Sequence, residues 1–546
     1  MRRIVQILGA LAALCMVSPA FAQDAPVVRA PTGSVRGEAA DGLHIFRGIP
    51  YARPPIGELR WRPPLQHPRW RDTRDATAFG PACVQPTARG TSIYAGELGP
   101  MNEDCLSLNI WAPAGARNAP VLVWIHGGSL VTGSGSEAMY DGARLAQHGI
   151  IVVSINYRLG ILGYMAHPAL SAESRRNISG NYGLLDQIEA LRWVHRNIGA
   201  FGGDASNVTI AGESAGALSV MYLLAAPDAR GLFHRAIAQS AYMITMPELR
   251  NSSFADLPAS EPIGIWLGTQ LGANDLPALR SMEAEAVTNA AVRAGYFPLG
   301  TIDGRTLRRQ LVDVFDRGEQ APVPILAGFN AGEIRSLRFL MPPAPADGDA
   351  YTNEIRSRYG DLADAFLAQY PASNIGESML ATTRDAMYGW TAERLVAKQT
   401  AAGAPSYLYF FDHAYPAADA LGLHAFHAAE IPYVFGTANR TPPRWPVPPT
   451  TPEEAQFTDA MVSYWATFAR DGVPRAAGQA DWQPYGAEQA YMAFEDAPRL
   501  RTDVLPGAYE LHEAVVCRRR AQGGVAWNWN VGVISPPLPP DTAECR

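Results

Sequence analysis

The serine at position 214 has the surroundings of a reactive nucleophile. It lies in the sequence Gly-Glu-Ser-Ala-Gly at 212–216, the one G-x-S-x-G segment of the chain. A strand-like run at 208–211 precedes this segment, and a helix-compatible run at 217–224 follows it. A serine in such a strand-to-helix turn is strained and presents its hydroxyl at the edge of a sheet. Because a serine hydroxyl is a weak nucleophile at neutral pH, the turn predicts covalent catalysis assisted by a general base.

Short apolar runs alternate with helical stretches around this turn. The predicted strands are 121–125, 150–155, 208–211, 323–327 and 407–411, and the predicted helices are 183–197 and 215–226. Continuous apolar strands are typical of a sheet buried on both faces, and strand–helix alternation is typical of parallel pairing. We therefore expect an α/β protein with a mostly parallel central sheet covered by helices on both faces.

Composition excludes several classes of protein. The 546 residues are 47% hydrophobic and 18% charged, which is too apolar for a disordered chain. A net charge of −7 provides no polybasic surface for nucleic acid. The Pro-rich segments 441–452 and 535–540 are expected to be a loop and a C-terminal tail, so 23–546 is expected to form a single catalytic domain.

The first 22 residues are typical of a secretory signal peptide. Arg2 and Arg3 precede an apolar run at 4–17, and an Ala-Phe-Ala sequence then predicts cleavage before Gln23. The alternative is a membrane anchor, but 14 residues are too few to span about 30 Å of hydrocarbon. We expect an exported protein, periplasmic or extracellular, without a stable membrane anchor.

Removal of this segment leaves four cysteines, Cys83, Cys105, Cys517 and Cys545. An even number in an exported protein predicts two disulfides with three possible pairings. Sequence proximity favours Cys83 with Cys105 and Cys517 with Cys545. Because no C-x-x-C or clustered Cys/His spacing occurs, we expect no metal site.

The chain resembles the type-B carboxylesterases, the α/β-hydrolase family that includes cholinesterases and para-nitrobenzyl esterases. The blocks that carry the resemblance run in family order from about residue 27 to 516, among them FRGIPYA at 46–52, EDCLSLN at 103–109, HGG at 126–128, NYRLG at 156–160 and FGGD at 201–204. The resemblance implies an α/β-hydrolase fold and supports the Cys83–Cys105 pairing. It also implies a structural ion pair between Arg60 and Glu103.

The general base is predicted through the same resemblance. In α/β-hydrolases the order along the chain is serine, acid and histidine. Five histidines follow Ser214, namely His234, His413, His424, His427 and His512. The sequence HAAEIPYVFG at 427–436 resembles the family's histidine motif, which implies that His427 is the base. His424, three residues earlier, is expected to have a surface or core role.

The acid and the oxyanion site follow by resemblance as well. The sequence GFNAGE at 328–333 resembles the acid motif and implies that Glu333 orients His427, although the family commonly has Asp-Glu-Gly where this chain has Gly-Glu-Ile. Asp303 and Asp347 are the alternative acids. The family's oxyanion donors correspond to the backbone N–H groups of three residues, Gly128, Ser129 and Ala215. Position 129 departs from the glycine or alanine of most relatives.

These residues together predict a secreted serine carboxylesterase that forms an acyl-enzyme on Ser214 and needs no cofactor. The alternative is a non-catalytic, cholinesterase-like binding or adhesion protein, which typically lacks a member of the triad. A third possibility is an enzyme that cleaves amides or thioesters. Activity is expected to fall as His427 becomes protonated, around its ordinary pKa of ~6.5. The sequence leaves the oligomeric state open.

The predicted substrate is a small-molecule ester, and two arginines suggest the chemical class of its acyl group. Arg335 and Arg338 follow Glu333 closely, and one of them is a candidate to bind an acidic acyl group. Some bacterial relatives remove polycarboxylic side chains from polyketide toxins such as fumonisins. The alternative for both arginines is a solvated surface position. Trp124 and Tyr140, near the predicted oxyanion segment, are expected either to line a gorge or to belong to the core.

Overall fold

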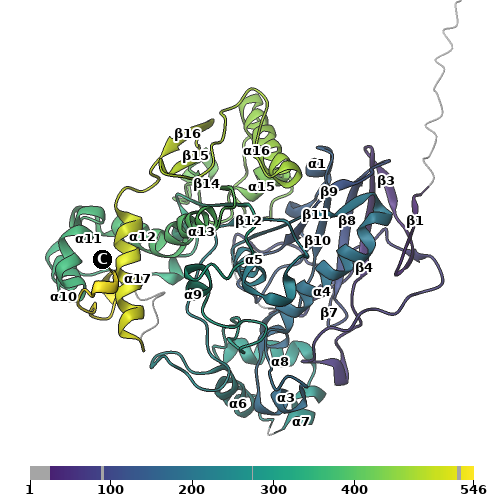
Figure 1. Cartoon of the computed structure of the whole chain (residues 1–546), viewed down its shortest axis with the longest axis horizontal. Coiled ribbons are helices and arrows are strands. Elements are labelled where there is room, and N and C mark those ends of the chain that lie inside the picture. Colours follow the sequence, from purple (N-terminus) through teal and green to yellow (C-terminus); the bar gives the residue numbers. More distant parts are fainter. Residues whose placement is uncertain (1–24, 88–91, 274, 525–530, 546) are drawn as a thin grey trace, which may run out of the picture.

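The protein is built on an eleven-stranded sheet (Figure 1). The computed structural model describes residues 25–87, 92–273, 275–524 and 531–545, and the predicted signal peptide at 1–22 lies outside them. The strand order is β16-β15-β14-β13-β12-β11-β9-β10-β8-β4-β3. Strands β15 to β10 of this order pair in parallel, whereas both edges of the sheet are antiparallel. This confirms the predicted mostly parallel sheet.

The strands of this sheet are β3 (Glu38–Ala40), β4 (Leu43–Pro50), β8 (Ser107–Pro113), β9 (Ala119–Ile125), β10 (Ile151–Ile155), β11 (Gly203–Glu213), β12 (Arg235–Gln239), β13 (Ile325–Asn330), β14 (Ser406–Phe411), β15 (Ala490–Phe494) and β16 (Pro498–Thr502). Two small sheets contain β1 (Val27–Ala30), β2 (Gly33–Arg36) and β5 (Arg74–Asp75), and β6 (Ala82–Cys83) and β7 (Met101–Asn102).

The α-helices are α1 (Ala143–Ala146), α2 (Gly160–Tyr164), α3 (Pro168–Glu173), α4 (Tyr182–Asn197), α5 (Ala215–Ala225), α6 (Ser260–Gln270), α7 (Leu276–Ser281), α8 (Ala284–Arg293), α9 (Leu311–Asp316), α10 (Gly348–Tyr359), α11 (Ala363–Gln369), α12 (Ile375–Arg384), α13 (Trp390–Ala401), α14 (Pro416–Asp419), α15 (Ile431–Phe435), α16 (Pro452–Asp471) and α17 (Ala508–Gln522). In Figure 1, α10, α11 and α17 gather at one end of the molecule, and α3, α6, α7 and α8 form a second group. Among the described residues, no helix has the length and hydrophobicity needed to cross a membrane.

Helices cover both faces of the sheet because its central strands are apolar on both sides. Along β9, Val121, Val123 and Ile125 belong to the core that contains α4, α5 and α13. The residues between them, Leu122 and Trp124, belong to the opposite core with α1, α15 and α16. Since successive strand residues point to opposite faces, an uninterrupted apolar run needs a helix layer on each side. This confirms the predicted two-sided covering.

The predicted elements lie in the expected places, with differences at their ends. Strands β9, β10, β11, β13 and β14 and helices α4 and α5 match the seven predicted runs. Strand β11 is longer than predicted and continues to Glu213, directly before the reactive serine. The sequence did not predict β3, β4, β8, β12, β15 and β16. In β16 four of the five residues are exposed, and in the central strand β12 the polar residues Arg235 and Gln239 leave an apolar run of only three residues.

Two disulfides join the cysteines as sequence proximity favours. Cys83 pairs with Cys105, with Cα atoms 5.0 Å apart, and Cys517 pairs with Cys545, with Cα atoms 5.7 Å apart. The second disulfide ties α17 to the Pro-rich tail, whose Leu538 N–H also donates to Arg358 O. The tail is therefore fastened against α10 and α17.

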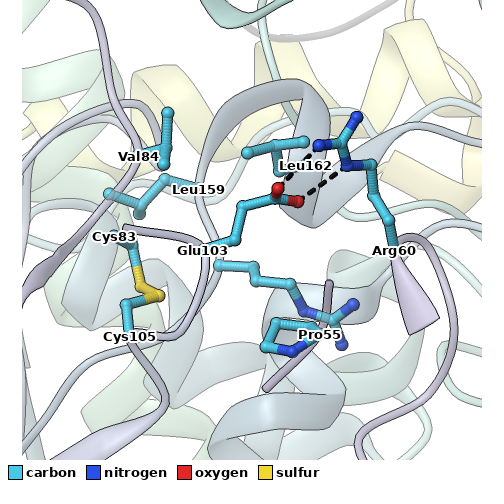
Figure 2. Close-up of a pocket in the computed structure, with 9 residues that line it drawn as sticks. Pro55, Arg60, Cys83, Val84, Glu103, Cys105, Leu159 and Leu162 are labelled. Atoms are coloured by element: carbon cyan, nitrogen blue, oxygen red, sulfur yellow. Dashed lines mark hydrogen bonds and ion pairs between the residues drawn. A yellow bond between two sulfur atoms is a disulfide. The ribbon is translucent and has the colours of Figure 1, made fainter. Parts of the chain in front are cut away.

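The predicted ion pair between Arg60 and Glu103 is present beside the first disulfide (Figure 2). The two side chains make two hydrogen bonds, Nε to Oε1 at 2.7 Å and Nη2 to Oε2 at 2.6 Å. Arg60 Nη1 also donates to Arg280 O at 3.1 Å, in the last turn of α7, and to Met282 O at 2.6 Å, just after the helix ends. The pair therefore joins an N-terminal loop to the α7–α8 region.

Loss of the Glu103 carboxylate should destabilise the fold. Glu103→Gln leaves the buried Arg60 guanidinium without its charge partner, and breaking such a pair costs about 3 kcal/mol. The matched control is Glu38→Gln, because the Arg47–Glu38 pair is more exposed and should contribute less than about 1 kcal/mol. Urea unfolding of the two variants measures the difference. Equal stabilities would contradict a structural role for Arg60 and Glu103.

Candidate active site

Ser214 lies in a strained turn that only small neighbours permit. It separates β11 from α5 and has φ 55° and ψ −120°, a conformation that costs free energy for a residue other than glycine. A Cβ atom at Gly212 would lie 2.5 Å from the backbone of Gly216, and one at Gly216 would lie 2.1 Å from Ile125 O. The Ser214 N–H donates to Gln239 O at 2.9 Å. The glycines of the motif are thus required by packing.

Glu333 and His427, separated by 94 residues, are hydrogen-bonded. Glu333 begins a short helical turn after β13 and is completely buried. Its Oε1 accepts the Asn330 N–H at 2.8 Å, and its Oε2 bonds to Nδ1 of His427. The Tyr94 hydroxyl donates to His427 O at 2.9 Å and steadies the turn that holds the imidazole. The structure therefore joins the predicted acid to the predicted base.

The other nitrogen of the imidazole lies against Glu213, a residue that the sequence analysis did not assign. His427 Nε2 is 3.0 Å from Glu213 Oε1. Within the described part of the chain, the Ser214 hydroxyl forms no hydrogen bond. The predicted nucleophile follows this carboxylate directly in the chain, as residue 214 after residue 213. The signal that points to Glu213 is its place inside the G-x-S-x-G segment itself.

Burial and charge shift the pKa values of this pair. Burial raises the pKa of Glu213 to about 8, although the charge of His427 opposes the shift. Burial alone lowers the pKa of His427, but the carboxylates of Glu213 and Glu333 outweigh it and raise the pKa to about 9. A base must be unprotonated to accept the serine proton. These shifts therefore favour activity on the alkaline side of the ordinary histidine pKa.

A buried polar network joins the turns that hold the predicted triad. Glu430 accepts from Gln239 Nε2 at 2.9 Å and from Asn330 Nδ2 at 2.6 Å. Asn330 Nδ2 also donates to Phe426 O, next to His427, at 2.8 Å. Gln239 O, in turn, accepts the Ser214 N–H. None of Gln239, Asn330 and Glu430 was assigned a role from the sequence. The signal for Glu430 is its position three residues after His427, within the same motif.

The glycine-rich turn after β9 presents unpaired backbone donors. Gly128 and Ser129 both have positive φ, 101° and 57°, and a Cβ atom at Gly128 would lie 2.3 Å from Thr132 O. Gly128 O accepts from the N–H groups of Val131 and Thr132, both at 2.9 Å, which closes the turn. Ser129 adopts the left-handed conformation despite having a side chain and is exposed.

The N–H groups expected at the oxyanion site have no competing partners. Among the described residues, the N–H groups of Gly128, Ser129 and Ala215 donate to no protein acceptor. Ala215 is the first residue of α5, so its N–H also lies at the positive end of the helix dipole. These three N–H groups are therefore free of protein acceptors within the described structure.

The alternative residues from the sequence have other partners. His424 faces Asp412 at 2.7 Å, and its ring has no link to Glu333. Asp303 accepts N–H bonds from its own turn, and Asp347 accepts from the N–H of Ala350 at the start of α10. Neither acid lies against His427, which leaves Glu333 as the carboxylate at Nδ1.

Of the residues considered for a substrate pocket, Trp124, Tyr140 and Arg335 have partners in the protein, whereas Arg338 is exposed. Trp124 and Tyr140 are buried against each other, with ring centroids 5.3 Å apart, and belong to the core. Arg335 pairs with Glu377 at 2.6 Å. Arg338 is exposed and has no ion-pair partner among the described residues. Of the two arginines, Arg338 is the one whose charge is uncommitted. The described residues contain no group of three His, Cys, Asp or Glu side chains able to hold a metal ion.

Comparison with known proteins matches nearly the whole chain. A model of the carboxylesterase family matches residues 24–510. The fumonisin B1 esterase of Sphingopyxis macrogoltabida is 38% identical over 484 residues, with 85% of each chain covered. The para-nitrobenzyl esterase of Bacillus subtilis (strain 168) is 35% identical over 473 residues, covering 85% of this chain and 93% of that one. A solved PNB esterase structure has a TM-score of 0.77 and 33% identity, covering 89% and 99% of the two chains.

The pH profile should depend on Glu213. The rate constant kcat/KM on a neutral ester should rise with pH through an apparent pKa above 6.5, because the neighbouring carboxylates raise the pKa of His427. Glu213→Gln removes one of those charges and should move the acid limb to lower pH by roughly one unit. The exposed Glu488 provides a matched control through Glu488→Gln. An acid limb that stays in place in Glu213→Gln would contradict the assignment of Glu213.

Proposed function

The chain belongs to the carboxylesterase family and is a carboxylic-ester hydrolase of the α/β-hydrolase fold, and we propose that it is an exported serine esterase. In this proposal Ser214 is the nucleophile, His427 is the general base and Glu333 is the acid that orients His427. The observation that carries the proposal is the contact between the buried Glu333 carboxylate and the imidazole of His427. Glu333 and His427 are 94 residues apart in sequence, so their contact supports a site assembled by the fold.

The proposed reaction begins when Ser214 Oγ attacks the ester carbonyl carbon and its proton passes to His427 Nε2. The carbon–oxygen bond to the leaving alcohol then breaks, and His427 returns the proton to that alcohol. Water attacks the acyl-enzyme in the same way and releases the acid, which regenerates the serine. Acid–base help of this kind contributes about 10²–10⁴-fold in rate. His427 Nε2 must leave Glu213 and meet the adjacent Ser214 during this cycle.

The N–H groups of Gly128, Ser129 and Ala215 are the proposed oxyanion donors. Negative charge develops on the carbonyl oxygen as the serine attacks, and each well-placed donor contributes about 3 kcal/mol to its stabilisation. Their lack of other partners in the described structure supports this role. Glu333 on Nδ1 fixes the tautomer of His427 and stabilises the imidazolium.

Export remains part of the proposal. The signal-like residues 1–22 predict removal before Gln23, and the two disulfides are consistent with an oxidising compartment. The same residues 23–546 would then form one catalytic domain. The alternative of a binding or adhesion protein is disfavoured because serine, histidine and glutamate are all present. Relative turnover of esters, amides and thioesters distinguishes the proposed esterase from an enzyme for the other two.

Covalent labelling tests the nucleophile. Diisopropyl fluorophosphate should inactivate the protein and add one adduct at Ser214, detected by mass spectrometry. Ser214→Ala should lose the adduct and at least about 10⁴-fold in kcat. Ser219→Ala is a matched control on the same helix, because the Ser219 hydroxyl bonds to Ala215 O. A label on another residue, or ester turnover that survives Ser214→Ala, would overturn the mechanism.

The substrate proposed for this esterase is a polycarboxylate ester of a fumonisin-like toxin. The similarity to a fumonisin B1 esterase supports this class. Arg338, with its uncommitted charge five residues after Glu333, provides a guanidinium for an acidic acyl group. The exposed ring of Phe339 beside it provides an apolar surface for the toxin's chain.

Discrimination between charged and neutral esters tests this substrate. Arg338→Ala should reduce kcat/KM for a tricarboxylate ester by roughly tenfold or more relative to a neutral ester, since a hydrogen bond to a charged group is lost. Arg335→Ala is the control, because Glu377 already occupies that guanidinium. If the ratio of the two substrates is the same in Arg338→Ala and wild type, the polycarboxylate proposal loses its residue-level support.

A further inference from the structure

A turn of π-helix lies beside His427. The turn η9 (Asp385–Gly389) interrupts the helical segment between α12 and α13. Asp385 is held by Arg384 Nε at 2.6 Å and by the Tyr370 hydroxyl at 3.0 Å. Arg384 Nη1 also donates to Ala331 O at 3.1 Å, two residues before Glu333. The π turn is therefore fixed both to its own helix and to the loop of the proposed acid.

This turn places Tyr388 over the proposed base. The ring centroids of Tyr388 and His427 are 5.3 Å apart, with the planes tilted by 43°. π-Helical turns frequently occur at functional sites, since the extra residue redirects a side chain. Tyr388 is only 2% exposed, so nearly all of its ring is used in packing.

Tyr242 meets Tyr388 from the side of the nucleophile. The two rings are edge to face, with centroids 6.1 Å apart. Tyr242 follows β12 by three residues, and the last residue of β12, Gln239, accepts the Ser214 N–H. The next residue, Met243, donates its N–H to the Thr391 hydroxyl of α13 at 2.9 Å. Tyr242 is thus held between the serine turn and the π turn.

The hydroxyls of both tyrosines lack a partner. Neither Tyr388 nor Tyr242 makes a hydrogen bond through its hydroxyl to any residue in the described ranges, although they are only 2% and 5% exposed. Tyr164 and Tyr409 also have hydroxyls without a partner, but their oxygens are fully buried. The hydroxyl oxygens of Tyr388 and Tyr242 are not fully buried. The two phenol oxygens therefore retain some accessible surface, and the ring of Tyr388 lies beside His427.

The hydroxyls of Tyr388 and Tyr242 can each donate a hydrogen bond to a bound substrate. Burial raises the pKa of both phenols well above its ordinary value, so they keep their protons at any pH of catalysis. A substrate that displaces water from such a hydroxyl without replacing its hydrogen bond costs about 1–3 kcal/mol, and a phenylalanine would fill the same space without that cost. An oxygen of the bound substrate offsets the cost in the complex. An alkyl group in the same place does not.

We propose that Tyr388 and Tyr242 form an acyl-group subsite that selects esters whose acyl chain carries a hydrogen-bond-accepting oxygen. The inference rests on the proposed function, because the acyl group becomes bonded to Ser214 and must lie near the segment that holds the serine turn. The acceptor is an ether or hydroxyl oxygen or a carboxylate oxygen, since a phenol donates to each. The subsite makes Tyr388 and Tyr242 specificity residues next to the proposed triad.

Isosteric esters test the subsite. Ethyl hexanoate and ethyl γ-methoxybutyrate differ by one methylene replaced by oxygen in the acyl chain, and monoethyl glutarate places a carboxylate there. Wild type should show a higher kcat/KM for at least one oxygenated ester than for ethyl hexanoate. Tyr388→Phe and Tyr242→Phe should each lower that ratio about tenfold, which corresponds to one lost hydrogen bond. Tyr164→Phe removes a sealed, unpartnered hydroxyl and should leave the ratio unchanged.

The arms of the experiment separate the possible results. A loss confined to the ether ester identifies an uncharged acceptor, and a loss confined to the glutarate identifies a carboxylate; either supports the subsite. An unchanged ratio in both variants overturns it. So does a loss seen only between butyl acetate and methoxyethyl acetate, where the oxygen is in the alcohol. Ethyl hexanoate turnover that survives Ser214→Ala would instead overturn the proposed function. Circular dichroism and thermal unfolding identify variants that fail to fold.

Discussion

A carboxylate with no exposure to solvent, Glu333, touches the imidazole of His427, and the geometry of the whole site depends on this contact. An ionised carboxylate inside a protein costs several kcal/mol unless it is paired and hydrogen-bonded. Here Asn330 N–H and the imidazole supply the partners. The sheet makes this possible, because β11, β13 and β14 are parallel and deliver their following turns to the same edge. The buried network around Glu430 then holds those turns in register.

The sequence predicts the parts of the structure that are local or carried by a motif. Apolar runs locate the central strands because these are buried on both faces, and the spacing around Ser214 locates its turn. The mostly exposed edge strand β16 escapes prediction because it has no apolar run. The central strand β12 escapes as well, because its three apolar residues between Arg235 and Gln239 are too few to stand out. His427 and Glu333 emerge from resemblance and not from composition. Their contact depends on tertiary packing across 94 residues, which no local pattern encodes.

The residues that the sequence did not reveal share a physical cause. Glu213, Glu430 and Tyr388 acquire their positions only when several elements meet around His427. Glu213 is an example, because in the sequence it occupies one of the unspecified positions of the G-x-S-x-G motif. In the fold its carboxyl lies 3.0 Å from the nitrogen that is proposed to serve Ser214. Glu213 thus lies at the imidazole nitrogen that the proposed mechanism requires for Ser214, and the protonation of its carboxyl sets the charge at that nitrogen.

The π turn at Asp385–Gly389 has a consequence for how this site can change. A π turn is equivalent to one residue inserted into an α-helix. Deleting a single residue there would restore the regular winding and rotate the preceding or following side chains by about 100° about the axis. Tyr388 would then swing away from the imidazole while the strands remained untouched. Deletion of one codon in this turn could therefore change the acyl preference of the enzyme while the central sheet stays the same.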